Sequence, residues 1–359
     1  METLTMNEQN NPFSIIFGKE PGQIIARDQI KEDIISDFTA QQPSMQVILL
    51  TGVRGSGKSA FTASLMKDFS NKKDWYVVDL LVEGDMLLSL ADKLSALPGL
   101  RSAFSDAKVS FSALGISAEM SGERKNLAVE AELDKMLQAL KKHKKRLLIT
   151  IDDVASIPTM KTFAHFYQSC LMKNYDVFLV MNGVYDNIEN LQNQKTLTFL
   201  QRSPKIKLEP FSKRAVFDLY AEVFNYPEKS LKYMASLTAG YPYAVQVLGY
   251  LVWKSGNKKD FDDNKLIQSY DNMLAEGVYN KLWTDMSEKN QKIALILAES
   301  PEQELLTSEM IRKLNNNKQT VTNYKKRLIQ KGILSDVTGK FIFALPRFKE
   351  FVIAERDYE

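Results

Sequence analysis

The segment QVILLTGVRGSGKSAF, residues 46–61, decides the fold class of this 359-residue chain. Its first half is a continuous apolar run, which is typical of a strand buried on both faces. A glycine-rich loop follows over 52–57, and a stretch with helical character then begins at Ser59. The loop fits the pattern GxxxxGK[ST] in full, and its glycines let backbone N–H groups turn inward around phosphates. The segment therefore predicts a phosphate-binding loop between a buried strand and a helix.

This loop predicts a bound nucleotide. Lys58 is expected to reach the β- and γ-phosphates, and the Ser59 hydroxyl to ligate Mg²⁺. The amino end of the following helix adds partial positive charge. The expected cofactors are therefore ATP or ADP together with Mg²⁺. The residues predicted to contact them in this segment are Gly52, Arg54, Gly55, Ser56, Gly57, Lys58, Ser59 and Ala60.

Two further apolar runs end in polar residues that suit the same chemistry. The run 147–153 ends in Asp152 and Asp153. Asp152 is predicted to hold Mg²⁺ and Asp153 to polarise the attacking water, the alternative being that the pair caps the next helix. The run 176–183 contains Asn182, which either reaches the γ-phosphate or the water, or begins an Asn-Gly turn.

The order of elements predicts an α/β fold. Near-continuous apolar strands separated by helices indicate a parallel sheet with helices on both faces. Strands are expected at 46–52, 75–81, 147–153, 176–183 and 205–211. Helices are expected at 28–39, 59–69, 85–97, 126–145 and 159–172, with a β-hairpin at 107–119. Beyond residue 212 the pattern is helical, so we divide the chain into a P-loop ATPase domain (1–212), a helical lid (213–285) and a C-terminal domain (286–359).

The composition excludes several classes of protein. With 47 Lys and Arg against 44 Asp and Glu, the net charge is only +3, so any nucleic-acid contact has to be local. The single cysteine, Cys170, rules out a disulfide framework within the chain, and two histidines disfavour a histidine-based metal site. No signal-peptide pattern and no apolar run of about 18 residues is visible. We therefore expect a cytoplasmic protein with no membrane partner.

The phosphate loop, the Asp pair and Asn182 together resemble the AAA+ ATPases. The nearest branches are the archaeal and origin-recognition-type initiator ATPases and the signal-transduction ATPases with numerous domains. The resemblance covers nearly the whole chain and implies a nucleotide domain, a helical lid and a C-terminal winged helix. It also implies that Asn182 is the residue called sensor 1 in that family.

The resemblance assigns three more residues. Arg27, in the segment 24–28, would lie against the adenine, although Ala26 stands where the family has glycine. Arg202, in TFLQRS, matches the arginine finger that enters a neighbouring subunit in that family, which leaves a homo-oligomer or another protein partner open. Pro242, in Gly240-Tyr241-Pro242, matches the proline that packs near the base. The simpler alternatives are a helix start for Arg27 and for Pro242, and a surface arginine for Arg202.

Two departures from the family pattern predict slow hydrolysis. Residues 236–255 contain no arginine, whereas initiators carry one in the lid. Asp153 stands where most members have glutamate, and its side chain is one methylene shorter. A misplacement of about 1 Å can reduce a rate on the order of 100-fold. We therefore expect tight binding of ATP and Mg²⁺ with slow turnover, as in a switch.

The C-terminal stretch 305–352 is predicted to be a winged helix that binds double-stranded DNA. Its second helix, 318–331, belongs to a segment with seven basic residues and no acidic one between 312 and 331. The residues expected to contact DNA are Lys318, Gln319, Thr322, Asn323, Lys325 and Lys326. The alternative is a solvated basic face on a winged helix that docks protein.

Two functional hypotheses therefore remain. The first is an ATP-dependent DNA-binding ATPase, and the second is a nucleotide-gated signalling or defence ATPase that contacts a protein partner. A metabolic kinase is weaker, because the C-terminal domain is superfluous for that chemistry. The basic run 141–146 is interpreted as a solvated helix end whose charges complement the helix dipole.

Overall fold

The computed structural model describes residues 11–16, 22–110, 123–256, 264–301 and 304–358. The chain divides into two compact units. One, which we call the sheet unit, consists of Arg27–Thr51 and Lys58–Lys207. The other, the helical unit, consists of Leu208–Glu359, the phosphate loop Gly52–Gly57 and the amino-terminal segment up to Ala26. The division into three domains at 212 and 285 stays a prediction.

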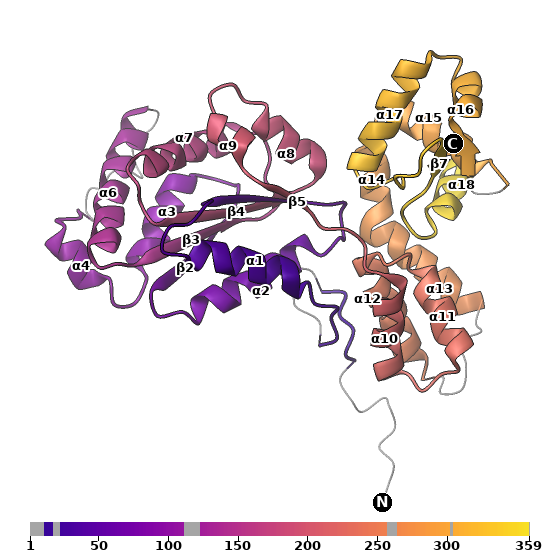
Figure 1. Ribbon diagram of the computed structural model, residues 1–359, viewed down its shortest axis with the longest axis horizontal. Coiled ribbons are helices and arrows are strands. Elements are labelled where there is room, and N and C mark those ends of the chain that lie inside the picture. The colour runs from indigo at the N-terminus through magenta and orange to yellow at the C-terminus, as the bar shows by residue number, and fades with distance from the viewer. Residues whose placement is uncertain (1–10, 17–21, 111–122, 257–263, 302–303, 359) are drawn as a thin grey trace, which may run out of the picture. The chain divides into compact units, whose positions relative to one another are not determined.

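The sheet unit is built on five parallel strands in the order β2-β3-β4-β1-β5 (Figure 1). Their bounds are β1 Val47–Thr51, β2 Trp75–Leu80, β3 Arg146–Ile151, β4 Val177–Gly183 and β5 Lys205–Lys207. All residues of β1 and β4 are buried, as the unbroken apolar runs predict. The sheet therefore forms the interior of this unit, and the predicted α/β fold class is confirmed.

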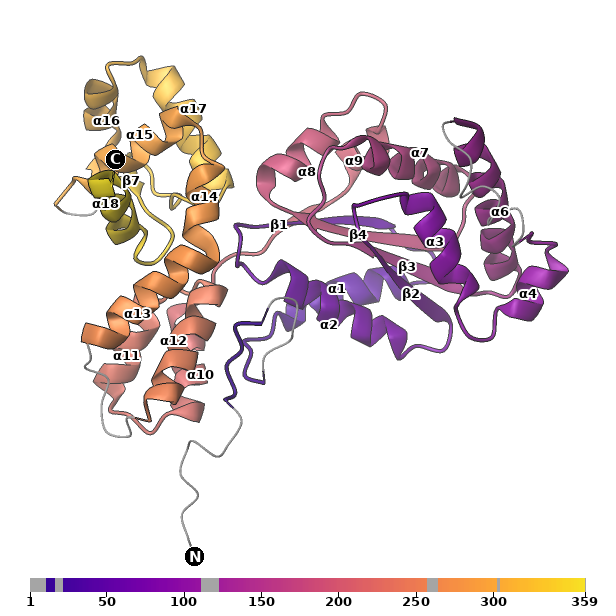
Figure 2. The same cartoon turned by 180° about the vertical axis from the view of Figure 1, so that it is seen from behind.

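Helices cover both faces of this sheet. The bounds are α1 Asp28–Thr39, α2 Lys58–Ser70, α3 Met86–Ser95, α4 Arg101–Asp106, α6 Glu123–Lys142, α7 Pro158–Met172, α8 Tyr185–Gln192 and α9 Thr198–Arg202. Helices α1 and α2 lie on one face, where Phe38, Phe69, Trp75 and Phe178 form a chain of ring contacts (Figures 1 and 2). Helices α3, α7 and α8 lie on the other face, which carries the larger apolar core.

The helical unit begins with α10 Lys213–Val223, α11 Glu228–Leu237 and α12 Pro242–Ser255. Ser212 caps α10 by accepting from the backbone N–H of Ala215 at 3.1 Å. Pro242 occupies the first position of α12, where its missing N–H loses no helical bond. Next comes one continuous helical stretch made of α13 Asn264–Leu274, the π-helical turn η2 Ala275–Tyr279 and α14 Asn280–Thr284.

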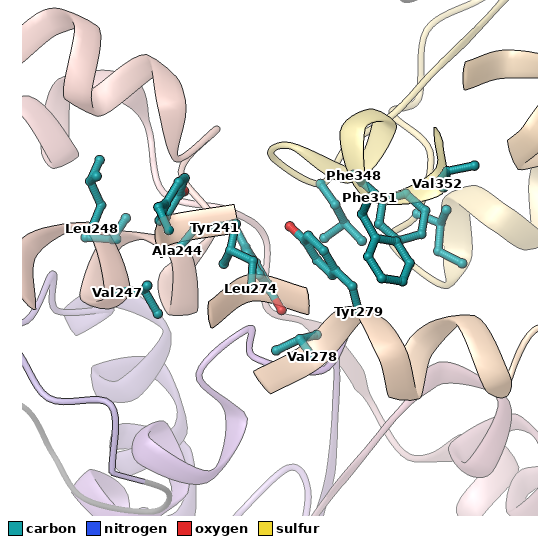
Figure 3. Packing of buried hydrophobic residues seen from close by; sticks show 14 of the residues in the cluster. Tyr241, Ala244, Val247, Leu248, Leu274, Val278, Tyr279, Phe348, Phe351 and Val352 are labelled. Carbon is teal, nitrogen blue, oxygen red and sulfur yellow. The ribbon is translucent and has the colours of Figure 1, made fainter. Parts of the chain in front are cut away.

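The C-terminal region packs helices against a small antiparallel sheet. It contains α15 Glu288–Ala298, β6 Glu304–Leu306, α16 Thr307–Leu314, α17 Lys318–Gln330, β7 Lys340–Ile342 and α18 Phe348–Tyr358. Tyr279 of η2 connects this region to the lid helices, since its ring lies against Phe348 and Phe351 (Figure 3). Its hydroxyl donates to the carbonyl of Pro346 at 2.5 Å. One apolar core therefore runs through the whole helical unit.

The structure adds short elements to the prediction. Helices α4, α8 and α9 and strand β6 have no counterpart in the sequence-based assignment, because each is too short to show a clear periodic pattern. The hairpin expected at 107–119 lies largely outside the described residues. In the part of the chain that the structure describes, no helix combines the length and apolarity needed to cross a membrane.

Candidate nucleotide site

The polar residues that follow two central strands meet at the carboxyl edge of the sheet. Ile151 pairs with Met181, so Asp152, directly after β3, stands level with Asn182 of β4. Asn182 and Gly183 are both inside β4, which excludes the Asn-Gly turn. The carboxyl ends of parallel strands are where open α/β sheets bind their ligands. The structure thus brings Asp152, Asp153 and Asn182 together, as the sequence predicts.

Asn182 is fully buried and connects three elements. Its Nδ2 donates to the Thr62 hydroxyl on α2 at 3.0 Å, and its Oδ1 accepts from the backbone N–H of Asp153 at 3.2 Å. Buried amides with both ends bonded hold a fixed orientation. Asn182 therefore sets the position of the loop after β3 relative to α2, and its amide has one further N–H to give.

Asp153 has a left-handed backbone conformation, with φ at 48°. Its backbone N–H also donates to Oδ1 of Asp152 at 2.9 Å, and its side chain is exposed. Asp and Asn adopt this conformation more readily than longer residues do, because their short polar side chains bond locally. The backbone therefore gives a physical reason for aspartate at a position where the resemblance expects glutamate. Neither aspartate caps the next helix, since the N-cap of α7 is Ile157.

Lys58 and Ser59 are the first two residues of α2. The Lys58 side chain is buried, while Ser59 is half-buried. Thr62 lies one turn further along α2 and is also buried. Because Thr62 follows Lys58 by four residues, both lie on the same face of α2. Sequence reasoning missed Thr62, although this spacing could have indicated it. The start of α2 therefore offers a lysine and a hydroxyl at a helix amino end, which is the arrangement that suits phosphate.

The phosphate loop itself requires its glycines. Gly55 and Gly57 have φ of 75° and 86°, in the left-handed region. A Cβ on Gly55 would lie 2.9 Å from Cβ of Tyr243 and would also meet the Tyr241 hydroxyl. The Ser56 hydroxyl is buried and has no hydrogen-bond partner among the described residues. A buried hydroxyl without a partner is unfavourable, and a phosphate oxygen would supply one.

Two tyrosines at the start of α12 hold this loop, and sequence reasoning missed both. The Tyr241 hydroxyl donates to the carbonyl of Arg54, and the backbone N–H of Tyr243 donates to the carbonyl of Gly55 at 3.1 Å. Burial raises the pKa of the Tyr241 phenol, so it stays a donor at physiological pH. These bonds engage loop carbonyls, while the backbone N–H of Ser56 donates within the loop to the carbonyl of Val53 at 3.1 Å. The tyrosines flank Pro242, which was the only local signal.

The residues present fit a nucleotide with Mg²⁺. The loop supplies glycines and the unsatisfied Ser56 hydroxyl. Ser59 and Asp152 supply the oxygen ligands that Mg²⁺ prefers. Each of these residues is chemically suited to the phosphate or metal ion that it would hold.

The positions of the three residues assigned by resemblance also fit the simpler alternatives. Arg27 precedes α1 at its N-cap and Pro242 opens α12, as the helix-start alternatives expect. Arg202 is the last residue of α9 and is exposed. An exposed guanidinium is available to a second molecule, but the contacts of Arg27, Arg202 and Pro242 with a nucleotide stay predictions.

Helix α17 presents most of the predicted DNA-contacting residues on one exposed side. Lys318, Gln319, Thr322, Asn323 and Lys326 are exposed, and so is Arg327. Asn317 caps this helix by accepting from the backbone N–H of Thr320 at 2.8 Å. The exposed side therefore carries basic and amide groups, and helix α17 contains no carboxylate.

Lys325 is placed differently from the other five. It is buried, and its Nζ donates to the carbonyl of Val337 at 2.6 Å and lies 5.5 Å from the ring centre of Phe341. Burial lowers the pKa of Lys325, although Asp336 opposes the shift. Lys325 thus attaches α17 to the following loop and strand, so it does not share the exposed side of the helix.

These features define a class of fold: that of the P-loop NTPases. Among solved structures, the Walker-type ATPase PABY2304 of Pyrococcus abyssi is similar over 92% of this chain and 96% of its own, with a TM-score of 0.62 and 14% identity. The Aeropyrum pernix ORC2 protein, solved as ADPNP–ADP complexes, is similar over 96% of this chain and 98% of its own, with a TM-score of 0.60 and 13% identity. At such identities the likeness concerns the fold.

Sequence comparisons add one finding. A family described as a domain of unknown function, DUF8462, matches residues 276–352. A search of curated proteins finds no match. The matched range holds α14 to β7 and the first part of α18, and it therefore includes the basic helix α17.

Proposed function

We propose that this protein is an ATP-binding AAA+ ATPase that hydrolyses ATP slowly, acts as a nucleotide-dependent switch and binds double-stranded DNA through α17. The observation that carries the nucleotide part is the meeting of Asp152, Asp153 and Asn182 at the strand edge, with Asn182 bonded to α2. Helix α2 begins with Lys58 and Ser59, the end of the phosphate-loop motif.

Each residue of this site has a proposed role. Lys58 neutralises phosphate charge, and Ser59 and Asp152 hold the metal ion. Bound Mg²⁺ would stabilise negative charge on the phosphates. Asp153 accepts a proton from the attacking water, and Asn182 orients that water with its remaining N–H. The left-handed backbone of Asp153 favours a short polar side chain at this position, and a carboxylate one methylene shorter than glutamate supports slow turnover.

The DNA part rests on the exposed side of α17. Lys318 and Lys326 would contact phosphates, while Gln319, Thr322 and Asn323 would face base edges. Lys325 is assigned to the attachment of α17 and not to DNA. If Arg202 acts as an arginine finger, the active form is a homo-oligomer in which it contacts a neighbouring copy.

One observation favours a second candidate, a signalling ATPase of the signal-transduction type whose C-terminal region docks protein. Basic residues near β7 are engaged internally, since Lys340 pairs with Glu304 at 2.5 Å, and Arg347 pairs with Asp271 at 2.6 Å. These two cations are therefore less available to DNA. The basic surface of the C-terminal region that remains available to DNA is therefore limited to α17 and its surroundings.

The test measures binding of fluorescent duplex DNA without nucleotide, with ADP and with a non-hydrolysable ATP analogue. We expect the analogue to strengthen binding, and the Lys58→Ala variant to lose this response while keeping nucleotide-independent binding. Nucleotide binding that survives without any DNA binding would support the signalling candidate instead. Failure of the wild type to bind nucleotide would refute the proposal as a whole.

A further inference from the structure

The sheet unit has a basic pocket at the end of the strands opposite to the candidate nucleotide site. It has a volume of about 350 Å³ and lies at the amino ends of β2 and β3, where Trp75 pairs with Arg146. Three segments distant in sequence meet there: the end of α1, the loop before β2 and the loop before β3. The lining residues are Thr39, Lys72, Lys73, Asp74, Trp75, Lys144 and Arg146.

Arg146 gives this pocket a fixed frame. Its Nη1 donates to the carbonyl of Phe38 at 2.8 Å and its Nη2 to that of Ala40 at 2.9 Å. The guanidinium carbon also lies 5.7 Å from the centre of the Trp75 ring. Because Arg146 is bound in this way, it holds the end of α1 against the sheet and contributes its charge from a set position.

The charge of the pocket is strongly unbalanced. Its lining has four cations and one carboxylate, a local excess equal to the net charge of +3 of the whole chain. The carboxylate, Asp74, is already paired with Lys145 at 3.2 Å. Lys145 also donates to the carbonyl of Lys73 at 2.9 Å. The pocket therefore has no free acidic group to neutralise its lysines.

Three ammonium groups of the pocket, those of Lys72, Lys73 and Lys144, have no hydrogen-bond or ion-pair partner in the described part of the chain. Lys73 and Lys144 are exposed. Lys144 has a left-handed backbone with φ at 53°, a conformation that glycine or asparagine adopts more easily. A lysine is therefore present at a turn position that its backbone does not favour.

We propose that this pocket binds a phosphate group, separately from the nucleotide edge of the sheet. Three ammonium groups suit a multiply charged anion, because lysine recognises phosphate as a point charge and needs no bidentate geometry. The Trp75 ring is buried against Phe69 and Phe178, so the pocket recognises charge and offers no stacking surface for a base. The phosphate belongs either to a free polyphosphate compound or to a nucleic-acid backbone.

The test compares two charge-matched double variants of the full chain. The pocket pair is Lys73→Ser with Lys144→Asn, and the control pair is Lys161→Ser with Lys195→Asn, which lie outside the pocket in the same unit. Both pairs carry Lys58→Ala to weaken phosphate binding at the loop. Tripolyphosphate binding is followed by calorimetry, and binding of a short labelled DNA duplex by anisotropy.

We expect the pocket pair to bind tripolyphosphate about tenfold more weakly than the control pair, since each lysine contributes close-range attraction. A parallel loss of duplex binding would identify a nucleic-acid backbone as the source, and unchanged duplex binding a free phosphate compound. Equal affinities in the two pairs would overturn the proposal, because the lysines would then be an ordinary solvated surface.

Folding of the variants can be separated from binding. Asparagine suits the left-handed backbone at position 144, so Lys144→Asn alone is expected to melt no lower than the wild type. This single variant should still weaken tripolyphosphate binding, by about threefold. Unchanged binding in this stable variant would also refute the proposal.

Discussion

Two adjacent lysines on α17 give a direct test of DNA binding, because one is exposed and the other is buried. Lys326 is exposed, whereas Lys325 is buried with its Nζ on the carbonyl of Val337. Replacing Lys326 by glutamine removes one candidate phosphate contact. Each such contact contributes about 0.9 to the slope of log affinity against log salt concentration, which corresponds to about eightfold in affinity near 0.1 M salt. We therefore expect Lys326→Gln to weaken duplex binding about eightfold and to flatten the slope by about 0.9.

The matched variant is Lys325→Gln, which removes the same charge from the next residue. We expect duplex affinity to change by less than about twofold and the salt slope to stay the same, because this ammonium does not reach the exposed side. Its effect should be on stability instead, since the Val337 carbonyl loses its donor. Anisotropy titrations at several salt concentrations measure both quantities. An equal loss of affinity in the two variants would refute the reasoning, since only overall charge would then matter.

Three further predictions concern the nucleotide site and stability. Tyr241→Phe removes a donor to the phosphate loop, and we expect ATP to bind about fivefold more weakly by calorimetry; an unchanged affinity would show that the hydroxyl does not position the loop. Asn182→Ala should lower the single-turnover hydrolysis rate at least about tenfold with ATP affinity nearly retained, and an unchanged rate would remove Asn182 from the mechanism. Burial raises the pKa of Asp134, but hydrogen bonds from Lys173 and Tyr175 outweigh it and hold that pKa below its usual range. Asp134→Asn should therefore reduce the free energy of unfolding by about 1 kcal/mol at neutral pH, and the difference should disappear as the pH falls below 3.8; a difference that persisted in acid would argue against this ion pair as the cause.

The sequence predicts the sheet unit well because its signals are local. Five apolar runs and the glycine motif are enough to place the strands, and Asp152 and Asn182 follow from the rule that parallel strands end at one edge. The sequence does not predict Tyr241 and Tyr243, since their bonds to the loop join residues almost two hundred positions apart. Contacts of this kind have no periodic pattern along the chain.

Lys325 shows a different limit. Its neighbours on α17 are basic and exposed, and composition alone groups it with them. Its position one turn after Val321 and three residues before Leu328 puts it on the buried side of the helix, as the structure shows. Helical periodicity would have separated it from the DNA-contacting set, but the charge pattern was given more weight.

The core shared by the lid helices and the C-terminal region has a consequence for how this half of the chain unfolds. The DUF8462 match begins at residue 276, inside the π-helical turn, and not at a boundary between folded parts. A fragment that starts there would lack Asp271, the partner of Arg347, and Leu274, which is fully buried. Limited proteolysis should therefore not release 276–352 as an independent folded piece. The lid helices and the C-terminal region are expected to melt in a single cooperative transition, so that mutations at Tyr279 lower the melting temperature of both together.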